Sequence, residues 1–221
     1  MTSLIPLLLT MAQAPAPAPP APGPKLDVKT VVAEVQKRYD AAGDFRARFT
    51  QTLTNPGLGR KTNSAGEVMF KKPGRMRWDY TAPEKKEFVS DGRRIYSYIP
   101  ADKQVILSTV PPDDEATTAV LFLAGKGNLT RDFKVSYAEG GGADTWTLRL
   151  DPKQKQREYD WLVLQVDRAS LQIRGLTAAD QEGGRSTFTF TNYRENAGIA
   201  DSVFVFKIPK GTDVITAGPG R

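Results

Sequence analysis

Hydrophobic and polar residues alternate with a period of two along most of this chain, which is typical of β-strands that bury one face. The clearest example follows the Pro73-Gly74 turn, where Met76, Trp78 and Tyr80 alternate with charged residues. Similar runs are separated by short glycine-containing turns, and this spacing predicts a large antiparallel meander instead of βαβ units. The other runs carry Phe45 and Phe49, Val68 and Phe70, Phe88, Tyr96 and Tyr98, Val105 and Leu107, Trp146 and Leu148, Leu162 and Leu164, Leu171 and Ile173, Phe188 and Phe190, and Val203 and Val205.

Two segments have helical periodicity. The first follows Asp27, a residue type that caps helix N-termini, and is expected to end at Ala42-Gly43. The second starts with Pro111-Pro112 and three acidic residues, and ends before Ala124-Gly125. It is apolar on more than one side, as expected for a lid over a sheet. The stripe that predicts packing of the first helix on the sheet is Val28, Val31, Val32, Val35 and Tyr39.

The N-terminal part of the chain has the composition of an export signal and a linker. Residues 1–14 hold a short apolar run that ends in Ala12-Gln13-Ala14, the small-x-small pattern of a secretory cleavage site. Residues 15–25 are rich in proline and alanine, which predicts an extended linker without a fold of its own. Residues 26–215 are then expected to form one domain, and 216–221 a short tail. Because no cysteine follows the apolar run, we expect a soluble exported protein and no lipid anchor.

The composition argues against catalysis, although carboxylate-only and Ser-Lys chemistry stay open without a motif that favours either. The 221 residues include no cysteine and no histidine, so a thiolate nucleophile, a Cys/His zinc site and a Ser-His-Asp triad are all excluded. No P-loop spacing is present, and we expect no metal and no cofactor. The formal net charge of +6 could favour an anionic partner. The densest basic cluster, Lys71, Lys72, Arg75 and Arg77, alternates with a core face, however, so we expect no nucleic-acid site. Because histidine and cysteine are absent, we also expect no enzyme.

An antiparallel sheet with an aromatic face and two covering helices can be interpreted in two ways. The helices can fill the face completely and form an ordinary core. Alternatively, the concavity can stay partly open and hold an apolar ligand, as in half-open barrels. Periodicity alone favours the ordinary core.

A series of short motifs occurs in a fixed order from about Phe45 to Ile215. No motif is specific alone, but with this order and spacing the chain resembles the LolA family of periplasmic lipoprotein carriers. The motifs are Phe45-x-x-x-Phe49-Thr50-Gln51, Gly66-Glu67, Lys72-Pro73-Gly74-Arg75-Met76-Arg77-Trp78, Pro83, Val89-Ser90-Asp91-Gly92, Tyr96-x-Tyr98-x-Pro100, Lys103-Gln104-Val105 and Phe204-x-Phe206-x-x-Pro209-x-Gly211-Thr212-Asp213-Val214-Ile215.

The resemblance implies a mainly β (α+β) fold, an unclosed half-barrel of about eleven antiparallel strands with a helical lid over a hydrophobic cavity. It also implies a periplasmic, monomeric carrier that binds the acyl chains of lipoproteins and shuttles them from the inner to the outer membrane. The implied partners are acylated lipoproteins, an inner-membrane ATP-driven releasing complex, and an outer-membrane acceptor lipoprotein or the membrane itself. A carrier or sensor of another amphiphile, such as a glycolipid, is the alternative.

Strand parity and motif position give the expected site residues. Trp146 and Leu148 are further cavity candidates for which a core role is equally open. Lys72, the basic residue before proline in the motif, is expected to hydrogen-bond the lid and help set its opening; the alternative is a solvated charge. We also expect Trp78→Glu to fold and to lose acyl binding. The cavity face is assigned to Phe49, Met76, Trp78, Tyr80, Phe88, Tyr96 and Tyr98, and the lid to Leu121 and Phe122.

Overall fold

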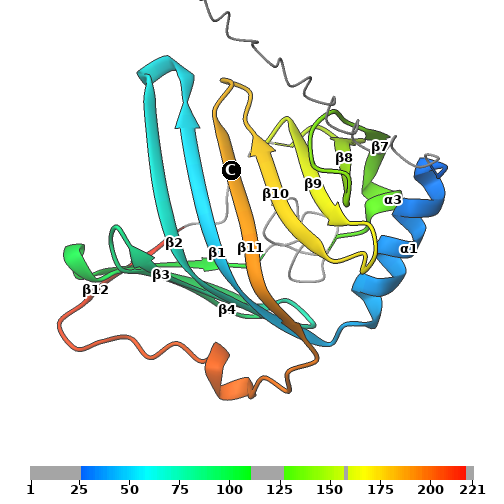
Figure 1. Cartoon of the computed structure of the whole chain (residues 1–221). Helices are drawn as coiled ribbons and strands as arrows, with labels where there is room; N and C mark the ends of the chain where they lie inside the picture. The colour runs from blue at the N-terminus through cyan, green and yellow to red at the C-terminus, as the bar shows by residue number, and fades with distance from the viewer. Residues whose placement is uncertain (1–25, 111–126, 157–158, 218–221) are drawn as a thin grey trace, which may run out of the picture.

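The computed structural model describes residues 26–110, 127–156 and 159–217, which form one open, curved sheet of 12 strands (Figure 1). The strand order is β12-β6-β5-β4-β3-β2-β1-β11-β10-β9-β8-β7, so β12 and β7 are the two edges and the sheet does not close. The strands are β1 (Asp44–Asn55), β2 (Arg60–Lys71), β3 (Arg75–Ala82), β4 (Lys86–Asp91), β5 (Arg94–Ile99), β6 (Gln104–Thr109), β7 (Phe133–Tyr137), β8 (Thr145–Pro152), β9 (Trp161–Asp167), β10 (Ile173–Ala179), β11 (Arg185–Glu195) and β12 (Asp213–Thr216).

The predicted antiparallel meander is confirmed, with one correction. Strands β1 to β6 and β7 to β11 form two meanders, and β1 pairs antiparallel with β11 to join them. The eleven antiparallel strands agree with the expected number, whereas a twelfth strand, which was not expected, pairs in parallel with β6. All four residues of β12 are exposed, so its sequence lacks the alternation of buried and exposed positions from which a strand is predicted.

Gly66 allows two parts of the sheet to approach closely. A Cβ atom at this position would lie 2.1 Å from the Asp79 carbonyl oxygen and 2.9 Å from the Cε1 atom of Phe49. The register of β2 against β3 also shifts between Ala65 and Gly66. Any larger residue would therefore push β3 and the Phe49 ring away from β2.

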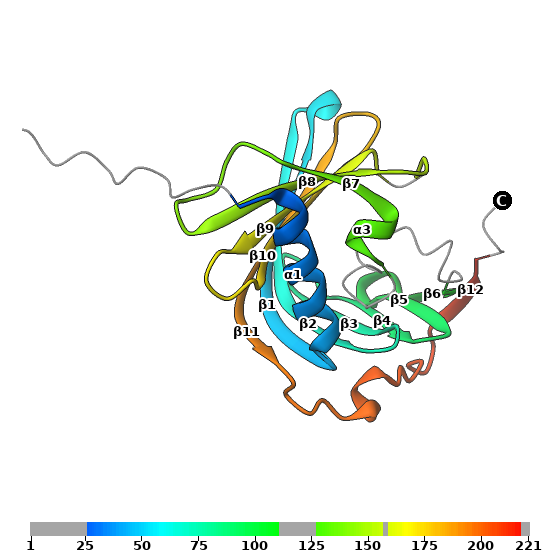
Figure 2. The ribbon, with the colours of Figure 1, turned by 90° about the vertical axis from the view of Figure 1, so that its right-hand side faces the viewer.

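Helix α1 (Val28–Ala41) packs on the concave face of the sheet (Figure 2). The predicted helix and its buried stripe are confirmed, since Val31, Val32, Val35 and Tyr39 belong to the core. Its predicted ends are only partly right. Asp27 precedes the helix but makes no side-chain cap hydrogen bond, and the chain leaves the helix at Ala42 with an extended backbone.

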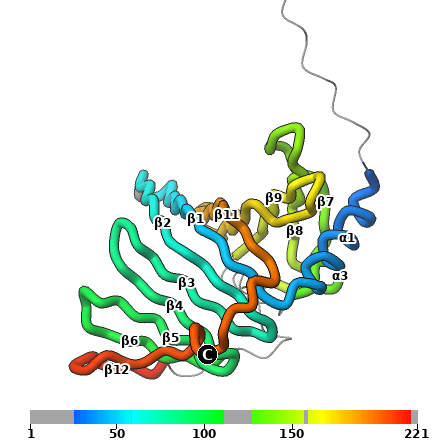
Figure 3. The backbone as a smooth tube through the Cα atoms, turned by 60° about the horizontal axis from the view of Figure 1, so that its bottom comes forward, coloured from blue at the N-terminus to red at the C-terminus, as the bar shows by residue number. Residues whose placement is uncertain are grey.

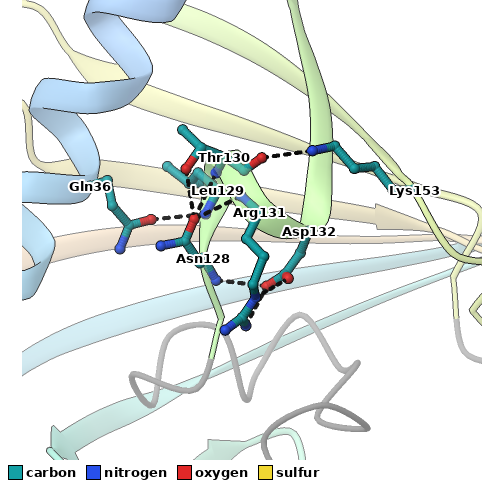
Figure 4. A network of polar contacts seen from close by, with 7 residues as sticks. All are labelled: Gln36, Asn128, Leu129, Thr130, Arg131, Asp132 and Lys153. Atoms are coloured by element: carbon teal, nitrogen blue, oxygen red, sulfur yellow. Dashed lines mark hydrogen bonds and ion pairs between the residues drawn. The ribbon is translucent and has the colours of Figure 1, made fainter.

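A polar network joins α1 to the short helix α3 (Leu129–Asp132), as Figure 4 shows. The Asn128 side chain caps α3 by accepting hydrogen bonds from the backbone N–H groups of Thr130 (3.0 Å) and Arg131 (2.8 Å). Gln36, which is only 8% exposed, accepts a hydrogen bond of 2.8 Å from the backbone N–H of Leu129. This contact fixes the start of α3 against α1. The second helix expected from the sequence, which includes Leu121 and Phe122, lies outside the described residues.

The chain beyond β11 crosses the convex face before it reaches the sheet edge (Figure 3). Val203 and Val205, expected on a strand, lie instead in or next to the 3₁₀ helix η4 (Asp201–Phe204). Phe204 is 1% exposed, and Asp201 forms ion pairs with Lys71 (2.7 Å) and Arg75 (2.8 Å). This segment therefore covers an apolar part of the convex face. None of the helices in the described ranges is long and apolar enough to cross a bilayer.

Candidate ligand-binding face

An aromatic cluster occupies the middle of the concave side, which we call the inner face. The ring centroids of Phe49 lie 4.9 Å from Trp78 and 4.8 Å from Tyr80, both edge to face, which is a favourable geometry for aromatic pairs. Cross-strand pairing places Phe88 beside Trp78, and Met76 follows on the same face of β3. The structure thus brings together five of the predicted site residues.

Burial divides these five residues into two groups. Phe49, Met76 and Trp78 are 2–5% exposed and belong to the closed core. Tyr80 and Phe88 are only half-buried and pack against that core. A ligand on the inner face would therefore meet Tyr80 and Phe88 first, with the other three side chains supporting them from below.

Trp146 and Leu148 lie deep in the other half of the sheet. Leu148 on β8 is fully buried opposite Leu164 of β9. The Trp146 ring is 6% exposed and lies under the guanidinium group of Arg168, at 4.0 Å. These positions favour the core alternative for both residues.

Tyr96 and Tyr98 lie on the opposite, outer face, which corrects the sequence-based assignment. Phe88 on the inner face pairs with Ser97, so the two tyrosines flanking Ser97 must point outward. Their rings contact Phe206 of the C-terminal segment, with centroid distances of 5.3 Å and 5.7 Å. They help to hold this segment on the sheet and do not share a surface with Trp78.

One cross-strand row connects the closed core to the open edge of the sheet. Trp78 pairs with Val68 and Phe88, and the register continues through Ser97 of β5 to β6 and β12. Exposure rises along this row, from 0% at Val68 and 3% at Trp78 to 39% at Ile106 and 46% at Ile215. We call Val68, Trp78, Phe88, Ile106 and Ile215 the apolar row. The sequence analysis did not identify Ile106 and Ile215, because only the pairing of β6 and β12 reveals their face.

Three polar side chains lie next to the aromatic cluster on the inner face, and we call them the polar belt. The Tyr80 hydroxyl donates a hydrogen bond of 2.9 Å to Gln51 Oε1, and Gln51 Nε2 donates one of 2.8 Å to Ser186 Oγ. Burial raises the pKa of Tyr80 to about 12, so its hydroxyl keeps its proton, and stays a donor, even above pH 10.

The raised pKa of Tyr80 predicts a loss of stability at alkaline pH. Because the folded protein holds this proton more tightly than the unfolded chain, its contribution is complete below pH 10 and is lost as the pH rises from 10 towards 12. Between pH 9 and 11 we expect Tyr80 to account for about 1–1.5 kcal/mol of lost unfolding free energy. Urea unfolding at both pH values should show a smaller drop for Tyr80→Phe than for the wild type. Equal drops would contradict the shift.

Lys72 ties the turn between β2 and β3 to the end of α1. Its Nζ atom donates a hydrogen bond to the backbone carbonyl of Tyr39 and lies 4.2 Å from the centroid of the Tyr39 ring. Desolvation lowers the pKa of this ammonium group, and the charges of Asp40 and Glu195 partly oppose the shift. Lys72 is therefore bonded to a helix that covers the inner face.

The described part of the chain has further features, besides the apolar row, that bear on ligand binding. It contains no group of three or more acidic residues that could hold a metal ion. A groove of about 320 Å³ beside α1 is lined by both charged and apolar side chains, whereas a pocket of about 220 Å³ between Arg46, Arg48 and Arg194 is lined mainly by polar ones.

Comparisons with known proteins identify a family and a similar fold. A family model described as outer membrane lipoprotein carrier protein LolA matches residues 41–207. An outer-membrane lipoprotein carrier protein of Pseudomonas syringae pv. syringae is 30% identical, covering 83% of this chain and 87% of the relative. One from Chromohalobacter salexigens is 32% identical, covering 81% and 83%. Among solved structures, an uncharacterized conserved protein from Thermus thermophilus has a similar fold, with a TM-score of 0.55 at 9% identity over 86% of this chain and 100% of that chain.

Proposed function

The chain belongs to the LolA family of outer membrane lipoprotein carrier proteins, and from this we propose that it is a periplasmic carrier that binds the acyl chains of lipoproteins on its inner face. The observation that carries the proposal is the apolar row, which leads from the closed core to large exposed side chains on one face. Contiguous apolar surface that opens to solvent is typical of binding sites, and this observation supports the proposal. Binding and transport, without catalysis, is the role that we assign.

The energetics of lipid transfer agree with a carrier of this type. A triacylated lipoprotein carries on the order of 40 methylene groups, and at ~0.8 kcal/mol each their full burial would be worth ~30 kcal/mol. That value exceeds the ~20 kcal/mol ceiling of useful non-covalent affinity, so a carrier that buried the chains completely would not release them. An open inner face that shields the chains only in part permits release. An ATP-driven releasing complex in the inner membrane would load the chains onto the carrier. An outer-membrane acceptor lipoprotein, or the membrane itself, would receive them.

Lys72 is proposed to restrain α1 over the inner face. In Lys72→Met the hydrogen bond to the Tyr39 carbonyl is lost, and we expect amide hydrogen exchange in the last turn of α1 to become about fivefold faster. Mass spectrometry of peptides from α1 would measure this. Lys72→Arg, which keeps a cationic donor, is the control and should exchange nearly as the wild type does. Equal exchange in Lys72→Met and the wild type would show that Lys72 is only a solvated charge.

Native mass spectrometry of the protein purified gently from periplasm tests the function directly. Acylated lipoprotein, or its lipid-modified N-terminal peptide, among the released ligands would support the carrier role. A free glycolipid would support the alternative carrier function. An empty protein that also failed to bind added acylated peptide would mean that the aromatic face is only a core.

A further inference from the structure

The inner face of the central strands changes from aromatic to polar within one step along β1. Phe49 is 2% exposed and belongs to the core, whereas the next inner-face residue, Gln51, is half-buried and polar. Gln51 pairs with Ser64 on β2. On β11 the inner-face residue next to Phe188 is likewise polar, namely Ser186. Uncharged polar side chains therefore lie directly next to the aromatic cluster on β2, β1 and β11, and two of them, Gln51 and Ser186, belong to the polar belt.

The polar belt is held together across β2 because Gly66 has no side chain. Gly66 pairs with both Phe49 and Tyr80, so the Tyr80 hydroxyl reaches over it to Gln51. These bonds leave hydrogen-bonding capacity in the belt. A carboxamide has two N–H groups, and Gln51 uses one of them for Ser186. The Ser186 hydroxyl accepts that bond and keeps its own hydrogen, for which the described residues show no acceptor.

We propose that the polar belt recognises the carbonyl oxygens of the ester or amide linkages that join acyl chains to the head of the ligand. This inference rests on the proposed carrier function and specifies which ligands the site prefers. Linkage carbonyls lose water when the chains enter an apolar site, and donors placed beside that site replace the lost hydrogen bonds. The belt thereby fixes how far the chains extend over the aromatic cluster.

The belt itself offers only uncharged donors, which suit a neutral linkage. Tyr80, Gln51 and Ser186 carry no formal charge at neutral pH. The residue opposite Tyr80 on β4 is Lys86, and its ammonium group lies 3.3 Å from the carboxylate of Glu84. The cation nearest to Tyr80 is thus already paired, and a carbonyl oxygen needs only the N–H and O–H groups of the belt.

The experiment compares two synthetic lipopeptides with equal chain lengths, one with two ester-linked chains and one with the same chains in ether linkage. Dissociation constants are measured for the full-length protein freed of bound lipid. We expect the wild type to bind the diester about fivefold more tightly than the diether, since one net hydrogen bond is worth about that factor. Gln51→Leu should bring the ratio close to one and leave diether binding almost unchanged.

Two further variants complete the test. Thr52→Val removes a hydroxyl from the outer face of the same strand, where it bonds Asn63, and should keep the wild-type ratio. Ser186→Ala should lower the ratio of diether to diester dissociation constants by about twofold. This variant keeps the test valid if Gln51→Leu does not fold. The proposed role of the polar belt would be wrong if the wild type bound both lipopeptides with equal affinity. It would also be wrong if Gln51→Leu and Ser186→Ala kept the wild-type ratio. Neither result would contradict the carrier function. Failure of the wild type to bind either lipopeptide would overturn both.

Discussion

Replacing Trp78 with alanine is expected to lower the free energy of unfolding by about 3–5 kcal/mol. The side chain is 3% exposed, and its ring centroid lies 4.9 Å from Phe49, 5.7 Å from Phe70 and 5.2 Å from Phe188. These rings come from three other strands, so they cannot all move in to fill the space that the indole leaves. Urea unfolding followed by circular dichroism would measure the loss.

Trp161 provides a matched control for this substitution. It lies on the outer face of β9, half-buried, with the guanidinium groups of Arg149 and Arg185 at 4.7 Å and 5.5 Å from its ring. Because water can replace these contacts, Trp161→Ala should cost only about 1–2 kcal/mol. A loss at Trp78 no larger than that at Trp161 would mean that the aromatic cluster is not a tightly packed core.

The burial of Trp78 also changes what Trp78→Glu can test. The sequence suggested that this variant would fold and lose only ligand binding. In the structure a glutamate at this position would place a carboxylate among aromatic rings, which is costly without a partner. We therefore expect the variant to unfold, and the role of the inner face has to be tested at a more exposed position.

Alternation in the sequence was sufficient to predict the sheet and the inner face of β3, but not the face of β5. The outer face is also buried there, because the C-terminal segment covers it. Val89 and Val105 are both 0% exposed on that side. Tyr96 and Tyr98 alternate correctly, yet alternation alone cannot decide which of two buried faces they occupy. Only the pairing of Ser97 with Phe88 settles it.

The open end of the apolar row was hidden from the sequence for a different reason. Ile215 lies on a strand of four residues, all exposed, whose partner β6 is more than a hundred positions earlier. Short, exposed strands have no periodic pattern, and contacts of such long sequence separation leave no local signal. The motif that ends at Ile215 is part of the resemblance to the family. The position of Ile215 beside Ile106, however, is seen only in the structure.

Replacing Phe88 with aspartate is expected to weaken binding of a diacylated peptide by about a hundredfold or more, with the fold retained. Phe88 is half-buried in the middle of the apolar row, and its ring packs against Tyr80 at 5.6 Å. The substitution removes an apolar contact worth about 1.5–3 kcal/mol and places a charge where acyl chains would lie. Since the side chain is partly exposed, the carboxylate can stay hydrated in the unliganded protein. Fluorescence titration with the lipopeptide would measure the affinity, and circular dichroism the fold.

Val205→Asp is the control for the added charge at Phe88. Val205 is 57% exposed and directly follows η4 in the segment that crosses the outer face, so this variant adds the same carboxylate away from the apolar row. It should bind the lipopeptide as the wild type does. Equal weakening in both variants would indicate a general effect of negative charge on an anionic or amphiphilic ligand. Unchanged binding in a folded Phe88→Asp protein would mean that the chains do not lie along the apolar row, and the carrier site would have to be sought on another surface.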